Sequence, residues 1–151
     1  MTIIVYRAGE MAADSGVIAG YRFAGTVTKL VRNAAGDIAG AAGPHADCYR
    51  FREWFAEGCQ GQFVPNDAGD IGFGALMVDA EGNVTRMDRH GTIYPGTKGA
   101  YHIEGCAEDI AAGALEHGAT AREAVEIVCR VWLGCAGPVC VERLDGAGDA
   151  A

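Results

Sequence analysis

Apolar and β-branched positions before residue 43 fall into short runs separated by polar or glycine-containing turns, a pattern typical of strands. It predicts a hairpin from residues 2–7 and 11–14, with its turn at Ala8-Gly9-Glu10. Residues 26–32 alternate β-branched with other side chains and predict another strand, and residues 38–42 predict a short buried one. The early part of the chain is therefore expected to form β-sheet.

Helical spacing replaces this pattern in three places. A first helix is predicted from Pro44 to about residue 57, because a proline at the first helical position loses no hydrogen bond. Its apolar side is expected to consist of Ala46, Tyr49, Phe51, Trp54 and Phe55. A second helix is predicted over residues 107–117. Thr120 and Glu123 match a capping box and predict that a third helix starts there.

The remaining pattern completes an α+β order of elements. Further strands are predicted at residues 72–78, 84–89, 92–94, 101–103 and 138–144, and residues 59–71 are expected to form a loop. Because strands and helices do not alternate strictly, we expect antiparallel sheets with the helices grouped outside them. One domain is expected over residues 1–144, followed by a disordered tail at 145–151.

Charge and hydropathy exclude several classes of protein. The net charge is −8 and the pI is about 4.8, which argues against a nucleic-acid surface. No apolar run approaches the roughly 18 residues that span a membrane, so no membrane partner is expected. The start of the chain lacks the basic and apolar regions of a signal peptide.

Six cysteines form no Cys-x-x-Cys pair, and no histidine lies at zinc-finger spacing from them. We interpret them as reduced, mostly buried thiols of a cytoplasmic protein rather than as metal ligands. Neither a metal nor a cofactor is expected.

Thr2 carries candidate chemistry, because it becomes the first residue once Met1 is removed. A threonine at a free N-terminus combines a hydroxyl nucleophile with an α-amine base. The unperturbed pKa of an α-amine, roughly 7.7–8.0, suits that task. The alternative is that Thr2 is an ordinary strand residue behind a start codon.

Segments along most of the chain carry a resemblance to a known family. They are Thr2-Ile3-Ile4-Val5, Met11-Ala12-Ala13-Asp14-Ser15, Thr28-Lys29-Leu30-Val31-Arg32, Ile38-Ala39-Gly40-Ala41-Ala42-Gly43-Pro44-His45-Ala46-Asp47, Gly105-Cys106-Ala107, Ala121-Arg122-Glu123-Ala124-Val125-Glu126 and Val139-Cys140-Val141. In this order they resemble the proteasome β-subunit family of N-terminal nucleophile hydrolases, which includes the bacterial HslV peptidases. The resemblance implies a four-layer αββα sandwich of two antiparallel sheets, in a short member of phage or bacterial type.

The resemblance also implies a catalytic site. Thr2 would be the nucleophile, Lys29 the cation beside it and Asp14 the carboxylate that holds this cation. Gly43 would supply the backbone N–H that stabilises the oxyanion. Cys106 stands where the family has a serine that supports the threonine amine. Taken singly, Asp14 could be a turn residue, Lys29 a solvated edge charge and Gly43 a simple turn.

The side-chain pocket next to Thr2 is expected to be mainly apolar. Its residues would be Val27, Val31, Ala41, His45 and Tyr49. Taken alone, His45 is better interpreted as a surface residue at the start of a helix than as an acid or base.

The implied function is that of a threonine-type endopeptidase working through an acyl-enzyme inside a self-compartmentalised homo-oligomeric ring. Its substrates would be peptides or unfolded proteins, and an ATP-dependent unfoldase would be the implied partner. Family members carry a second long helix where this chain has the loop Cys59–Ile71, so the symmetry of the ring is left open. The alternatives are a catalytically inactive assembly or binding protein of the same fold, and an amidohydrolase that acts on a small non-peptide substrate.

Overall fold

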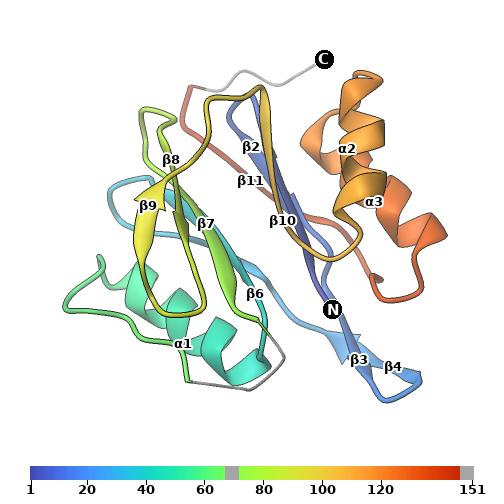
Figure 1. The fold of residues 1–151 in the computed structure, drawn as a ribbon, viewed down its shortest axis with the longest axis horizontal. Coiled ribbons are helices and arrows are strands. Elements are labelled where there is room, and N and C mark those ends of the chain that lie inside the picture. The colour runs from blue at the N-terminus through green and yellow to red at the C-terminus, as the bar shows by residue number, and fades with distance from the viewer. Residues whose placement is uncertain (67–71, 147–151) are drawn as a thin grey trace.

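Two antiparallel sheets form the centre of the molecule, which a computed structural model describes for residues 1–66 and 72–146 (Figure 1). The four-stranded sheet has the order β10-β1-β2-β11 and consists of β1 (Ile3–Arg7), β2 (Glu10–Ala13), β10 (Tyr101–Gly105) and β11 (Cys140–Arg143). The five-stranded sheet runs in chain order and consists of β5 (Leu30–Arg32), β6 (Ile38–Ala42), β7 (Gly74–Val78), β8 (Val84–Met87) and β9 (Ile93–Pro95).

Helices cover the outer face of each sheet (Figure 1). Helix α1 (His45–Ala56) packs on the five-stranded sheet, whereas α2 (Glu108–Glu116) and α3 (Ala121–Val131) pack on the four-stranded sheet. This arrangement confirms the predicted α+β class with antiparallel sheets and helices grouped outside them. None of the helices in the described part of the chain is long and apolar enough to cross a membrane.

Strand β1 explains why the first run of the sequence is almost continuously apolar. Ile3 and Val5 face the cluster under α2 and α3, whereas Ile4 and Tyr6 face the cluster between the two sheets. Successive side chains of a strand point to opposite faces, so a strand covered on both sides needs apolar residues at every position. Both faces of β1 are therefore buried.

The buried side of α1 differs from the predicted one. Tyr49 and Ala46 are exposed, and the residues that face inward are Asp47, Cys48, Phe51 and Phe55. Their spacing of three and four residues places them on one face of the helix. Phe51 lies in the apolar cluster between α1 and the sheet, where its ring contacts those of Trp54, Phe55, Phe63 and Phe73.

The strand predicted over residues 26–32 is wrong, because the chain leaves one sheet and enters another within it. Its first residue ends β4 (Arg22–Thr26), which pairs with β3 (Gly16–Ala19) in a separate hairpin. Its last three residues form β5, which pairs with β6. The sequence pattern did not predict the hairpin β3–β4.

The other predicted elements are confirmed, with their ends within two residues of the predicted ones. Residues 59–66 of the predicted loop contain neither helix nor strand, and residues 67–71 lie outside the described residues. Of the predicted tail, Asp145 and Gly146 form a turn and residues 147–151 lie outside the described residues.

The capping box of α3 is present and offers a test of local stability. Thr120 Oγ1 accepts a hydrogen bond from the Glu123 backbone N–H at 3.2 Å, and the Glu123 carboxylate accepts one from the Thr120 N–H at 2.8 Å. Thr120→Ala removes the first bond and is expected to lower the free energy of unfolding by about 1 kcal/mol in urea denaturation. Thr97→Ala, at an exposed threonine outside the helices, is the matched control and should leave it unchanged. Equal stability of the two variants would show that the cap contributes nothing.

Candidate functional site

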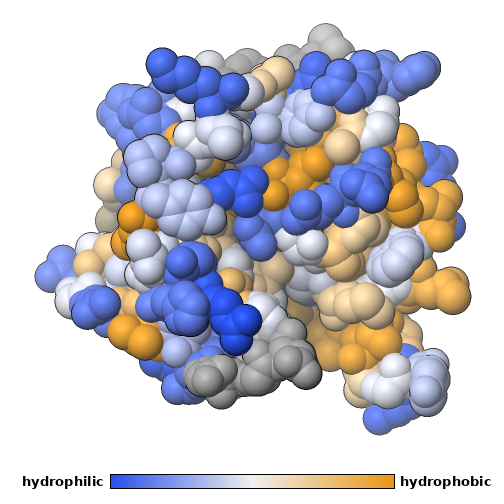
Figure 2. Space-filling model, in the orientation of Figure 1, coloured by the Kyte–Doolittle hydropathy of each residue, from blue (hydrophilic) through white to orange (hydrophobic). Residues whose placement is uncertain are grey.

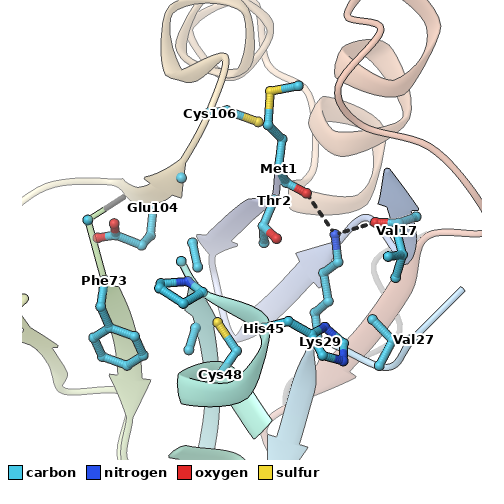
Figure 3. A pocket seen from close by; sticks show the side chains of 18 of the residues that line it. Met1, Thr2, Val17, Val27, Lys29, His45, Cys48, Phe73, Glu104 and Cys106 are labelled. Carbon is cyan, nitrogen blue, oxygen red and sulfur yellow. Dashed lines mark hydrogen bonds between the residues drawn. The ribbon is translucent and has the colours of Figure 1, made fainter. Parts of the chain in front are cut away.

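The first residues of the chain lie at one end of the four-stranded sheet, where the Lys29 side chain reaches them (Figure 3). Lys29 is 5% exposed, and its Nζ donates to the Met1 carbonyl oxygen at 3.0 Å and to the Gly16 carbonyl oxygen at 2.9 Å. It also donates to both carboxylate oxygens of Asp14, at 3.0 and 2.9 Å. An ammonium group has three donors, and all of them are engaged here. Lys29 is therefore not a solvated edge charge.

Asp14, directly after β2, is completely buried and holds both Lys29 and the backbone around it. Its Oδ1 accepts from the Ile3 N–H at 3.1 Å, and its Oδ2 accepts from the Ala136 N–H at 3.4 Å. A buried carboxylate needs a counter-charge and hydrogen bonds to offset the loss of water. Asp14 has both, so it joins β1, the loop after α3 and Lys29 in one network.

The backbone of Thr2 is held from the opposite side by the end of β10. The Cys106 N–H donates to the Thr2 carbonyl oxygen at 2.7 Å. Gly105 has a φ of +115°, and a Cβ at this position would collide with that same oxygen. Only glycine fits so close to another backbone. Thr2 is thus fixed through Cys106 and, one residue later, through the Ile3–Asp14 hydrogen bond.

A cavity of about 670 Å³ opens beside Thr2 (Figure 3). Its walls come from the start of the chain, the hairpin β3–β4, the end of β6, helix α1 and the end of β10. The surface is hollowed between the α1 side of the molecule and that hairpin, where apolar residues face the hollow (Figure 2). Met1, Thr2 and Lys29 all line this cavity, which therefore gives a ligand access to the first residues.

Three of the five residues predicted for the side-chain pocket line the cavity: Val27, Ala41 and His45. The other two lie elsewhere. Val31 packs against the cluster under α1, and Tyr49 is 54% exposed outside the lining.

Cys48 and Arg52 line the cavity although the sequence analysis did not select them. They follow His45 by three and seven residues, so helical spacing from His45 could have identified them. Burial raises the pKa of the Cys48 thiol to about 11, so this thiol is neutral at pH 7. Burial lowers the pKa of Arg52, but a guanidinium stays protonated in proteins. The cavity is mainly apolar and has a cationic side chain on the α1 side.

Gly43 lies where β6 turns into α1 and also lines the cavity. Its φ is +138°, a conformation that residues with a Cβ rarely adopt. A Cβ here would lie 2.7 Å from the Gly72 carbonyl oxygen and 2.9 Å from Phe73 Cα. Both the conformation and the space require glycine.

Cys106 has a partner that the sequence analysis missed. Its Sγ lies 3.1 Å from the Sγ of Cys135, in the loop between α3 and β11. The hydrogen bond from Cys135 lowers the pKa of Cys106 to about 7, although burial opposes this shift. The same hydrogen bond, together with burial, raises the pKa of Cys135. The separation of 29 residues between the two cysteines carries no local signal of this contact.

Candidate metal sites are absent from residues 1–66 and 72–146. No group of three His, Cys, Asp or Glu side chains there is arranged to hold a metal ion.

The fold is that of HslV-like, proteasome-type structures, which confirms the resemblance at the level of the fold. The crystal structure of a eukaryotic HslV from Trypanosoma brucei matches with a TM-score of 0.67 and 20% identity, over 94% of this chain and 98% of that one. Thiobacillus denitrificans BPH, solved in complex with epoxomicin, matches with a TM-score of 0.65 and 14% identity, over 95% and 98%. A second structure of Thiobacillus denitrificans BPH matches with a TM-score of 0.65 and 14% identity, over 96% of this chain and 98% of that one. No protein-family model matches the sequence, and no curated protein matches it.

Proposed function

We propose that this chain is a threonine-type endopeptidase in which Thr2 becomes the nucleophile once Met1 is removed. The observation that carries the proposal is the hydrogen bond from Lys29 Nζ to the Met1 carbonyl oxygen. The carbon of that carbonyl is bonded to the Thr2 nitrogen. The distance from Lys29 Nζ to the Thr2 nitrogen is therefore at most about 5.6 Å. Removal of Met1 would leave the ammonium group next to a new α-amine, facing a cavity.

The proposed reaction is acyl transfer. Thr2 Oγ attacks the carbonyl carbon of a substrate peptide bond, and the Thr2 amine accepts the hydroxyl proton. Lys29 favours the deprotonated forms of this residue through its charge, and Asp14 holds Lys29 in place. The amine then passes the proton to the leaving amino group, and water hydrolyses the acyl-enzyme to release the acid and restore Thr2.

Gly43 and Cys106 complete the proposed site. The Gly43 backbone N–H would stabilise the oxyanion, a contribution of roughly 2.7–4 kcal/mol for a single donor. Cys106 would take the place of the family's serine near the amine, since its backbone already holds Thr2. Val27, Ala41 and His45 would contact the substrate side chain, and the mainly apolar wall favours an apolar one.

The proposal extends to architecture and assembly. The three buried clusters support a four-layer αββα sandwich, with one cluster between each pair of layers. Large apolar side chains are exposed on the hairpin and after α3, among them Tyr21, Phe23 and Leu133. We infer that these side chains contact further copies of the chain, as the proposed homo-oligomeric ring would require. Peptides or unfolded proteins would enter it, delivered by an ATP-dependent unfoldase in the cytoplasm.

Intact-mass spectrometry before and after treatment with epoxomicin tests both processing and reactivity. We expect a protein lighter by one methionine residue that gains one epoxomicin, because an epoxyketone reacts with a hydroxyl and a free amine on the same residue. Thr2→Ala, which leaves a small first residue for the same processing, should lose Met1 but gain no adduct. Retained Met1 without an adduct would contradict the peptidase and favour a non-catalytic assembly protein of this fold.

A further inference from the structure

The contact between Cys106 and Cys135 joins two segments that are distant in the sequence and adjacent to Thr2. Among the six cysteines, all in the described part of the chain, this is the one pair whose sulfurs touch. Cys135 is 2% exposed, whereas Cys106 is half-buried and lines the cavity (Figure 3). The Cys106 thiol is therefore accessible to a small oxidant from the cavity, whereas the Cys135 thiol is buried next to it.

The two sulfurs are close enough to bond after a small movement. They are 3.1 Å apart, and a disulfide bond is about 2.05 Å long, so an approach of about 1 Å is needed. Cys106 lies between β10 and α2, and Cys135 lies in the loop that follows α3. Neither cysteine is inside a helix or strand, so this approach need not break a ladder of backbone hydrogen bonds.

We propose that Cys106 and Cys135 form a reversible disulfide with a peroxide as oxidant, and that this bond switches off the site at Thr2. The second half of the inference rests on the proposed function. The cysteine pair would thus be a site of oxidation by peroxide. This role is additional to the one proposed above for Cys106, which is to support the Thr2 amine.

The reaction balances with one peroxide and two thiols. The Cys106 thiolate attacks one peroxide oxygen, the O–O bond breaks, and the second oxygen leaves and is protonated to water. The Cys135 sulfur then attacks the sulfur of the Cys106 sulfenic acid and forms the S–S bond, the S–O bond breaks, and the departing hydroxyl takes the Cys135 thiol proton and leaves as a second water. The two thiols lose two electrons, which the peroxide takes up. A dithiol reverses the bond through two thiol–disulfide exchanges.

The ionisation of Cys106 supports this order of attack. The thiolate is the reactive form of a cysteine, and the hydrogen bond from Cys135 lowers the pKa of Cys106 to about 7. The rate of oxidation should therefore increase as pH rises through about 7. In a reducing compartment such a disulfide would be transient, as regulatory disulfides are.

The hydrogen bonds around the pair couple it to the candidate nucleophile. The Cys106 N–H holds the Thr2 carbonyl oxygen at 2.7 Å, and the Ala136 N–H holds Asp14 Oδ2 at 3.4 Å. Drawing the two sulfurs together by about 1 Å is expected to shift these two backbone groups, because one belongs to Cys106 and the other to Ala136, which directly follows Cys135. A misplacement of that size can reduce the rate of an enzyme by about 10²-fold. We therefore expect hydrolysis to fall by about 10- to 100-fold on oxidation and to recover with dithiothreitol.

The test compares the full chain after dithiothreitol and after hydrogen peroxide. Digestion without reductant should give one cross-linked peptide that contains Cys106 and Cys135, and mass spectrometry identifies it. Cys135→Ser should form no cross-link and should lose the response to peroxide, measured relative to its own reduced state. Cys59→Ser, at a half-buried cysteine under α1, is the matched control and should keep both.

Hydrogen exchange gives a second measurement that needs no hydrolysis. Oxidation should speed exchange of the Ile3 amide, which donates to Asp14. The cross-link and the change in exchange could both occur in a protein whose reduced form hydrolyses no peptide. That outcome would support the disulfide and contradict the proposed peptidase activity. Absence of the cross-link, or a cross-link that changes neither exchange nor hydrolysis, would overturn the inference.

Discussion

Thr2→Ala is expected to reduce peptide hydrolysis by roughly 10⁴-fold or more, the scale seen when a nucleophile is deleted from a catalytic group that acts as a unit. The substitution removes Oγ, the atom proposed to attack the substrate, and leaves the α-amine in place. Thr2 is half-buried and held through its backbone by Cys106, so the alanine variant should remain folded. Its free energy of unfolding should stay within about 0.5 kcal/mol of the parent.

Thr2→Ser is the matched variant for this experiment, because it retains both the hydroxyl and the α-amine. We expect it to keep measurable hydrolysis of a fluorogenic peptide under conditions where Thr2→Ala shows none. Intact mass should confirm that Met1 is removed from all three proteins, so that a blocked amine does not cause the difference. An alanine variant as active as the parent would remove Thr2 from the mechanism.

Lys29→Met is expected to impair both stability and hydrolysis. Methionine matches the length of the lysine stem but leaves the fully buried Asp14 carboxylate without its counter-charge. Breaking a buried ion pair by removing one partner costs about 3–5 kcal/mol. Hydrolysis should fall by roughly 10²-fold or more, since a preorganised charge at the reacting group is lost. Lys98, the other lysine of the chain, is exposed, so Lys98→Met is the matched control and should change neither stability nor hydrolysis.

A double substitution separates the two effects of Lys29. Adding Asp14→Asn to Lys29→Met removes the unpaired charge while keeping an oxygen for the Ile3 N–H. The double variant should therefore be more stable than the sum of the two single changes predicts. Denaturation experiments on the three variants measure this difference in the free energy of unfolding as a coupling energy. Hydrolysis should remain low, because the ammonium is still missing. If Lys29→Met is as active as the parent, Lys29 is a structural residue only.

Local elements could be predicted because each carries its own signal. The capping box at Thr120 and Glu123 marked the start of α3 through contacts only three residues apart. The run of apolar residues in β1 marked a strand, since the period of a backbone conformation is visible within a few residues. The order of these elements also determined the α+β class. The resemblance extended this to the fold that the comparisons confirm.

The predictions from the hydrophobic pattern were wrong where a contact with a residue distant in the sequence determined the local structure. Residues 26–32 alternate like one strand, yet the buried Asp14 carboxylate draws Lys29 into the interior and the chain changes sheets at that point. Tyr49 fits the apolar spacing of α1, but the rotation of the helix is set by Phe51, which packs into the aromatic cluster beneath it.

Sequence by itself determined most of the elements and their order, except for the hairpin β3–β4, and the residue types that a nucleophile site would need. Only the tertiary structure decided that Lys29 lies against the carbonyl of Met1, and that Cys106 meets Cys135. The physical reason is the range of each effect. Strand and helix periods arise from neighbouring backbone dihedrals, whereas these contacts join residues 28 and 29 positions apart that come together only when the sheets and their connecting loops pack.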